Sequence, residues 1–242
     1  MLTVLFSPSE GKNAGGNKSK KELFGSDEAR EKILNEYESI IQRANEEELR
    51  ELFGIKNPNE FTPYLQGVKA APLMCAVERY DGVAYDYLNY SSLSEDAQGH
   101  LKKNTIIFSN LYGPILAGDT IANYKVKQGN DIGSIAPDGY YNKRFSYQLD
   151  LFLADKEVLD LRAGYYDKFY KPNKPFTTLK FLKDGKTVSH WAKAYRGTVL
   201  REIAKHQVNS MEEFMKLNIE GLHVKEIKQI KNKTEIVYDI LS

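Results

Sequence analysis

Residues that can bind anions or move protons follow directly after two apolar runs of the chain. Leu2–Phe6 is followed by Ser7 and Lys12, and the apolar run 106–108 is followed by Ser109. A buried strand of an α/β fold commonly delivers ligand-binding residues from its C-terminal end. We therefore expect these side chains to meet at one edge of a sheet. The alternative is that the glycine-bearing segments only supply turn geometry.

Four residues beyond these runs extend the set. Tyr112 and Lys125 can contact an anion, and Asp119 can act as a general base or bind a ribose. Asp81 offers the same carboxylate chemistry. Each aspartate also fits a simple turn beside a glycine. Asp81 and Asp119 are therefore the catalytic candidates, without an identified nucleophile.

A basic pair and a group of tyrosines add binding chemistry. Lys193 and Arg196 share one face of a predicted helix and can hold a phosphate or carboxylate, although for an isolated pair two solvated cations are the favoured interpretation. Tyr85 can stack on a base, or it can pack at the edge of the core. The predicted nucleic-acid- or anion-binding residues are Ser7, Lys12, Tyr85, Ser109, Tyr112, Lys125, Lys193 and Arg196.

Several site classes lack their sequence signals. The serine-hydrolase elbow, the P-loop and the dinucleotide fingerprint are not found in the sequence. The histidines, among them His190, His206 and His223, have no ligand-like spacing, so we predict no metal site and no cofactor. Direct iron binding is the weakest hypothesis for this reason.

Charge is distributed unevenly along the 242 residues. The net charge is +1, but from Arg162 onward 16 Lys and Arg face 9 Asp and Glu, a balance of +7. Such an excess favours an anionic partner, DNA or another phosphate-bearing ligand, or it only solvates exposed hairpins. Cys75 is the single cysteine and is expected to be a buried, inert thiol in a helix. With no membrane helix or signal peptide in the pattern, we expect a cytoplasmic protein without membrane contact; protein partners are not indicated.

The predicted elements alternate between strands and helices, which indicates an α+β (mixed α/β) fold. We expect one domain over residues 1–242, with a central mixed sheet and a helical lobe at about 26–103. A helix capped by Ser26 or Asp27 is expected to bury an apolar face made of Ile33, Tyr37, Ile40, Ile41 and Ala44. A second helix is expected from Asn45 to a stop at Gly54. Two helical pieces are expected within 57–80, giving the outline of a helix-hairpin-helix clamp, and a helix capped by Ser94 completes the lobe. Further elements are predicted as a loop at 109–129, helices at 140–155, 193–207 and after Ser210, and strands at 158–161, 177–182, 187–191, 223–227 and 235–241.

Several short segments, in order, carry a resemblance to a known family. They are Leu5-Phe6-Ser7-Pro8, Tyr80-Asp81-Gly82-Val83-Ala84-Tyr85 with Leu88, Ser94-Glu95-Asp96, Ser109-Asn110-Leu111-Tyr112-Gly113, Asp119, Tyr124-Lys125, Gly129, Ser189, Ala192-Lys193, Arg196-Gly197 and Asn218-Ile219-Glu220-Gly221. With these the chain resembles the YaaA family of bacterial peroxide-stress proteins over nearly its full length. It departs from the family pattern at Asn110 and around 140–147.

The resemblance implies a one-domain protein with a positively charged cleft and a helix-hairpin-helix-like element. It also implies protection from hydrogen peroxide, limitation of free iron and oxidative damage, and binding of DNA, including distorted or unpaired duplex. Two functions remain open beside iron binding. One is a DNA-binding stress protein, and the other is an enzyme that acts on a nucleotide or damaged base in the same cleft.

Overall fold

A sheet with five adjacent parallel strands forms the centre of the molecule. In the computed structural model these strands are β12 (Lys233–Ile240), β9 (Phe176–Lys183), β8 (Glu157–Asp160), β1 (Leu2–Phe6) and β5 (Thr105–Ser109), in that spatial order. Antiparallel strands β11 (Leu222–Ile230) and β6 (Gly113–Leu116) complete the two edges, and β10 (Lys186–Thr187) pairs with β9. The structure describes residues 1–19, 23–25, 27–43 and 45–241, without the side chains of 27, 189 and 190. The predicted mixed α/β fold with a central mixed sheet is confirmed.

Strand β1 lies inside the sheet, between β8 and β5, and all five of its residues are buried. A continuous apolar run such as Leu2–Phe6 is typical of a strand that is covered on both faces. From β1 the chain first reaches β5 on one side and later β8 on the other. Such a reversal of strand order opens a crevice beyond the C-terminal strand ends, where ligands bind in open α/β sheets.

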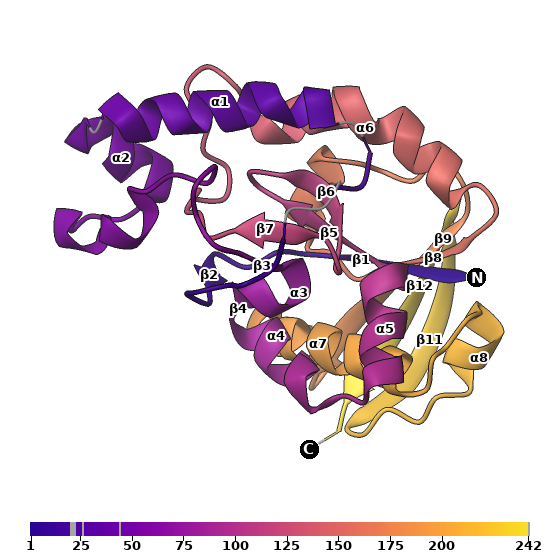
Figure 1. Ribbon diagram of the computed structural model, residues 1–242. Helices are drawn as coiled ribbons and strands as arrows, with labels where there is room; N and C mark the ends of the chain where they lie inside the picture. The colour runs from indigo at the N-terminus through magenta and orange to yellow at the C-terminus, as the bar shows by residue number, and fades with distance from the viewer. Residues whose placement is uncertain (20–22, 26, 44, 242) are drawn as a thin grey trace.

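Helices cover both faces of the sheet. Figure 1 shows α1 (Asp27–Arg43) and α6 (Pro137–Leu153) across one side, with α4 (Val83–Leu88), α5 (Glu95–Asn104) and α7 (Ser189–Lys205) on the other. The remaining helices are α2 (Glu46–Phe53), α3 (Ala76–Arg79) and α8 (Met211–Met215). No helix within the described residues is long and apolar enough to cross a membrane.

The capping signals in the sequence were reliable. Asn45 accepts hydrogen bonds from the amides of Glu47 and Glu48, and Gly54 ends α2 in the left-handed conformation. Ser94 and Ser210 cap α5 and α8 in the same way, so these predicted helix starts are confirmed. The predicted cap at Ser26 and the helix end at Ala44 lie outside the described residues.

Two helical pieces were predicted within 57–80, and this prediction was largely wrong. The segment holds two 3₁₀ helices, Pro58–Glu60 and Thr62–Tyr64, then β3 (Leu73–Cys75) and the short helix α3. Its prolines interrupt regular helix, and β3 instead pairs with β7 (Thr120–Ala122). The helix-hairpin-helix element is therefore not confirmed, and Cys75 is buried at a strand end rather than within a helix.

Residues 109–129, predicted as a loop, contain β6 and β7. Strand β6 folds back on β5 with Ser109 opposite Gly113, whose φ of 68° suits glycine. Strand β7 depends on pairing with the distant β3, which local propensity does not encode, whereas β6 forms a tight local hairpin with β5. The hairpin at Asp184-Gly185 is confirmed, but its second strand ends at Thr187, because α7 begins at Ser189.

Candidate functional site

Two serines tie loops together at the C-terminal ends of the central strands. Ser7 follows β1, and its Oγ accepts a hydrogen bond from the amide of Ala163 at 2.8 Å. Ser109 ends β5, and its Oγ accepts from the amides of Tyr112 at 2.9 Å and Leu111 at 3.2 Å. The serines therefore anchor the loops that follow β5 and β8 at the strand-order reversal.

A chain of three hydroxyls extends from Ser109. The Tyr124 hydroxyl lies 2.8 Å from Ser109 Oγ and 2.9 Å from the hydroxyl of Tyr80. Because both lone pairs of Ser109 Oγ accept amide protons, its own proton points to Tyr124, whose hydroxyl shares a further hydrogen bond with that of Tyr80. Burial raises the pKa of Tyr124 to about 12, although hydrogen bonds from Ser109 and Tyr80 act in the opposite direction. All three hydroxyls are therefore protonated and neutral at physiological pH.

Lys12 lies against this chain because of a two-residue strand pairing. Strand β2 (Gly11–Lys12) runs antiparallel to β4 (Tyr80–Asp81), with Lys12 opposite Tyr80. Lys12 Nζ is 4.0 Å from the centroid of the Tyr124 ring and 5.4 Å from that of Tyr80. It donates to the carbonyl oxygens of Ser9 at 3.2 Å and Glu10 at 3.3 Å. A partly buried amine is thus held on an aromatic wall.

The charges around Lys12 favour its neutral form. Burial lowers the pKa of Lys12 to about 7, the positive charges of Lys125 and Arg79 act in the same direction, and Glu10 opposes them. The Glu10 carboxylate binds other groups: it accepts hydrogen bonds from Lys125 Nζ at 3.3 Å and from the Gln128 amide at 3.1 Å. Within the described part of the chain, no carboxylate lies at ion-pair distance from Lys12.

Burial by itself would raise the pKa of Glu10. The Gln128 amide, Lys125 and Lys12 outweigh this effect, and the pKa of Glu10 is lowered. The surroundings of Lys12 therefore combine the basic side chains of Lys125 and Arg79 with the ionised carboxylate of Glu10. We call Lys12, Tyr80, Ser109, Tyr124 and Lys125 the strand-end cluster.

Arg79 positions the loop that carries Lys12. Its side chain is fully buried and donates to the carbonyls of Asn13, Gly15 at 2.8 Å and Pro72 at 2.9 Å. The Asn13 amide donates back to the Arg79 carbonyl at 2.8 Å. Sequence reasoning missed Glu10, Arg79 and Tyr80 as members or supports of this site. The one available signal was an arginine among the apolar residues of 73–80.

Tyr85 and Tyr112, predicted as binding residues, form the inner wall. The Tyr85 hydroxyl donates to the Ser7 carbonyl at 2.9 Å, and the Tyr112 hydroxyl accepts from the Ala122 amide at 3.3 Å. The Tyr112 and Tyr124 rings meet edge to face with centroids 5.5 Å apart. Both predicted residues are buried, so in this structure their rings support the cluster and offer no open stacking surface.

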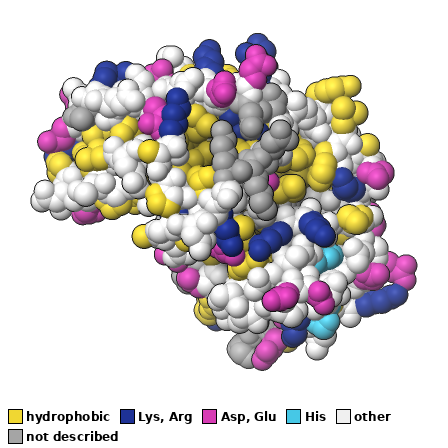
Figure 2. All heavy atoms as spheres, viewed as in Figure 1, with side chains coloured by type: hydrophobic (Ala, Val, Ile, Leu, Met, Phe, Trp, Pro, Cys, Tyr) yellow, Lys and Arg dark blue, Asp and Glu magenta, His cyan; other side chains and the backbone are white. Residues whose placement is uncertain are grey.

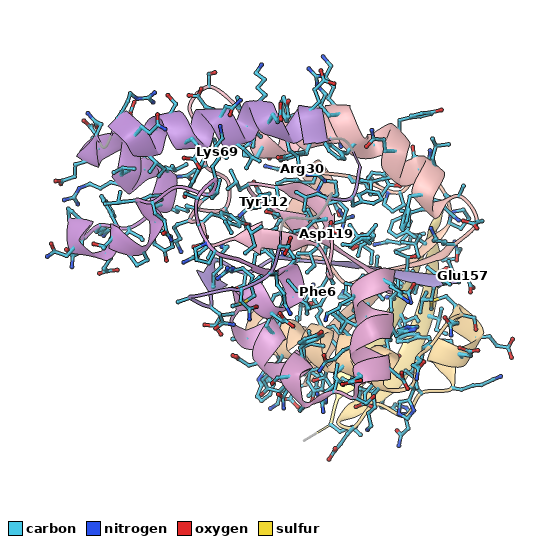
Figure 3. The ribbon with its side chains drawn as sticks, viewed as in Figure 1. Phe6, Arg30, Lys69, Tyr112, Asp119 and Glu157 are labelled. Carbon is cyan, nitrogen blue, oxygen red and sulfur yellow. The ribbon has the colours of Figure 1, made fainter. Side chains whose placement is uncertain are left out.

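The two candidate acids lie apart from each other. Asp119 Oδ2 accepts from the amides of Leu116 at 2.8 Å and Phe24 at 3.0 Å, so it holds a turn together. Figure 3 shows Asp119, Tyr112 and Arg30 together beneath α1. Asp81 is exposed and lines a cavity of about 410 Å³ whose wall also includes Tyr80 and Tyr85.

Lys193 and Arg196 lie on α7, on the side of the sheet opposite to α1 (Figure 1). Lys193 is exposed, whereas burial lowers the pKa of Arg196 and the nearby Asp160 carboxylate opposes this change. Asp160 is the last residue of β8, so Arg196 approaches the strand ends. Within the described residues no hydrogen bond or ion pair joins either α7 cation to Tyr112 or Lys125, so their predicted placement in one cleft stays a prediction.

A larger cavity, of about 630 Å³, lies under α1. Its lining is mainly apolar, with Arg30, Lys69 and Tyr112 among its polar members. Figure 2 shows apolar side chains beneath α1, and basic and acidic side chains interspersed over the same face. The described residues contain no group of three His, Cys, Asp or Glu side chains placed to hold a metal.

The sheet and the strand-end cluster define a mixed α/β protein with cations and neutral hydroxyls at a strand-order reversal. The chain belongs to the family described as peroxide stress protein YaaA, whose model matches residues 1–228. An uncharacterized protein of Campylobacter jejuni is 46% identical over 249 residues, covering 99% of this chain and 100% of that protein. A UPF0246 protein of Fusobacterium nucleatum is 26% identical over 96% of this chain and 97% of its own length. One from Streptomyces coelicolor is 29% identical over 84% and 82%.

Proposed function

We propose that this member of the peroxide-stress family protects the cell by binding DNA, with a preference for distorted or unpaired duplex, at the strand-end cluster. The observation that carries the proposal is the Lys12 amine, which is held on the Tyr124 ring with no carboxylate at ion-pair distance and is a cation below its pKa of about 7. Lys125 adds a second cation nearby, and its partner Glu10 offsets only one of these charges. A site of this charge attracts phosphate.

Ser7 and Ser109 act in this proposal as anchors of the loops around the phosphate. Arg196 and Lys193 extend the cationic surface from the β8 end along α7. The excess of basic residues after Arg162 supports long-range attraction of a polyanion. Distorted duplex is favoured because its backbone can bend to follow a recessed cationic site.

The test is fluorescence anisotropy with a labelled duplex that contains an unpaired bubble, titrated over a range of salt concentrations. Affinity should fall steeply with salt, and Lys125→Ala or the pair Lys193→Ala and Arg196→Ala should reduce the salt slope by about one per lost phosphate contact. Lys186→Ala, an exposed lysine of β10, is the matched control. Two results would overturn the proposal. One is an affinity that is undetectable at low salt, and the other is an affinity that neither Lys125→Ala nor the pair Lys193→Ala and Arg196→Ala weakens.

The second candidate is an enzyme that acts on a nucleotide or damaged base at the same place. The hydroxyl chain from Ser109 through Tyr124 to Tyr80 favours it, because such a chain can pass protons beside the Lys12 amine. A panel of nucleosides and duplexes with single damaged bases tests this function. Absence of turnover by the wild-type protein across the panel would remove it.

A further inference from the structure

The aromatic residues of the chain differ in exposure, and this difference bears on how an unpaired base is held. Tyr85 and Tyr112, the residues expected to stack on bases, are buried, and their hydroxyls are bonded to backbone groups. Trp191 on α7 is the single tryptophan of the sequence and is 39% exposed. A base of any type can stack on an exposed indole. Trp191 is therefore the first candidate for contact with an unpaired strand.

A row of aromatic rings supports Trp191 from the sheet. The centroid of the Trp191 ring lies 6.4 Å from that of Tyr195, one helical turn later on α7. Tyr195 stacks on Phe181 of β9 at 5.8 Å, and Phe181 stacks on Tyr238 of β12 at 6.1 Å. Phe181 and Tyr238 are buried, so the row runs from the core to the surface. Contact with this row restricts the outer ring, and a restricted ring loses less entropy when a ligand stacks on it.

Helix α4 adds a second exposed aromatic side chain beside this row. Tyr87 of α4 is 46% exposed. The two helices approach closely, because a Cβ atom at Gly197 would lie 2.0 Å from the carbonyl oxygen of Ala84. Burial raises the pKa of Tyr195, and the nearby Tyr87 acts in the same direction. We call Trp191, Tyr195 and Tyr87 the aromatic patch.

The charges around the aromatic patch favour phosphate at one of its ends. Lys193 is exposed two residues after Trp191, and Lys183 Nζ lies 5.1 Å from the centroid of the Trp191 ring. Within the part of the chain that the structure describes, no carboxylate lies at ion-pair distance from either lysine. A carboxylate, that of Glu220, lies near Tyr195 and repels phosphate there. A bound strand therefore places its phosphates on the Lys193 side.

We propose that the aromatic patch is the stacking platform for an unpaired DNA strand, with a base on the Trp191 ring and the flanking phosphate at Lys193. The proposal rests on the proposed DNA binding and names where that function distinguishes unpaired from paired strands. In a paired duplex each base face is covered by the next base, so only phosphate contacts remain. The strand passes Arg196 from the strand-end cluster and ends at Trp191. Lys186, paired across the hairpin with Lys183, lies beyond this path.

The fluorescence of Trp191 tests the proposal in the unaltered protein, because the chain has no other tryptophan. Two duplexes of equal length are titrated at low salt, one fully paired and one with a central bubble of unpaired thymines. A base that stacks on an indole quenches its emission. We expect the bubble duplex to quench Trp191 strongly at saturation and the paired duplex to leave its emission nearly unchanged.

Substitution of Trp191 supplies a second readout, the affinity measured by anisotropy. Trp191→Ala should weaken binding of the bubble duplex by about tenfold, the contribution expected from one stacked base, and leave binding of the paired duplex unchanged. Trp191→Phe keeps an aromatic face and should retain most of the bubble affinity. The matched control is Tyr147→Ala, since Tyr147 is 73% exposed on α6, across the sheet from α7 (Figure 1). It should change neither affinity.

Three results would overturn the proposal and leave the DNA binding intact. They are an unchanged or equal emission of Trp191 with the two duplexes bound, a bubble affinity that Trp191→Ala does not weaken, and a loss in Trp191→Ala that is equal for both duplexes. The last result would assign the indole to the fold or to a partner other than an unpaired strand. If neither duplex binds at low salt, the proposed function fails, and the stacking platform fails with it.

Discussion

Replacing Lys12 by methionine tests whether the buried amine is destabilised as a cation. The pKa of Lys12 is about 7 in the folded protein against 10.5 for the free side chain. A group with a lowered folded pKa contributes stability above its unfolded pKa, and this contribution is lost as pH falls toward the folded pKa. The wild-type protein should therefore lose stability between about pH 10.5 and about pH 7 through this residue.

The magnitude follows from the shift. At about 1.36 kcal/mol per pKa unit, the full penalty approaches 5 kcal/mol, which is an upper bound because Lys12 is partly exposed. Between about pH 9.5 and about pH 6.5 the linkage relation gives a loss of at most about 3 kcal/mol, by the same upper bound. Methionine keeps the length of the side chain and carries no proton, so Lys12→Met should lack this loss.

Urea unfolding of both proteins at the two pH values measures the effect, since contributions from the other titrating groups cancel in the difference. The stability of Lys12→Met relative to wild type should be greater at the lower pH by up to about 3 kcal/mol. Lys186→Met, at an exposed position of β10, should show a difference that does not vary with pH. A pH-independent difference for Lys12→Met would refute the reasoning.

Three further predictions concern binding and packing. Affinity for the bubble duplex, measured by anisotropy, should weaken by about fivefold, or ~1 kcal/mol, between about pH 6 and about pH 8, because Lys12 loses its charge. This pH dependence should disappear in Lys12→Met. A pH-independent wild-type affinity would contradict the prediction. Asp119→Ala should lower the free energy of unfolding by about 1–3 kcal/mol, since two backbone amides lose their acceptor. Asp119→Asn should recover part of this loss. Unchanged urea midpoints would show that the carboxylate does not support the turn. Gly197→Ala should lower the free energy of unfolding by about 1–3 kcal/mol in the same urea assay, because the new methyl group would meet the Ala84 carbonyl where α7 packs on α4. The neighbouring change Thr198→Ala should have a smaller effect. Equal effects of the two changes would be inconsistent with this close packing.

The sequence was sufficient where local signals and burial agree. The strand Leu2–Phe6 and the caps Asn45, Ser94 and Ser210 were predicted correctly, since each depends on a few adjacent residues. Strands β3 and β7 were missed because they pair with each other across a long stretch of sequence. Strand β6 forms a tight hairpin with β5 and was missed because its residues were assigned to a loop.

The site shows the same limit. Placing Ser7 and Ser109 at neighbouring strand ends required only the parallel order of β1 and β5, which a sequence pattern can suggest. The contact between Lys12 and Tyr124 depends on the pairing of β2 with β4 and on the buried Arg79, which no local pattern encodes. Tyr112 and Asp119 were predicted as site residues, and the hydrogen bonds of their side chains serve the fold.

Protection of individual lysines by bound DNA tests the central claim most directly. Wild-type protein, with and without saturating bubble duplex, would be labelled by formaldehyde and cyanoborohydride, and the rate at each lysine would be followed by mass spectrometry. The account predicts that the duplex slows labelling of Lys12 and Lys125 strongly and leaves Lys186 unchanged. Unchanged labelling of Lys12 and Lys125 while the duplex is bound would contradict it.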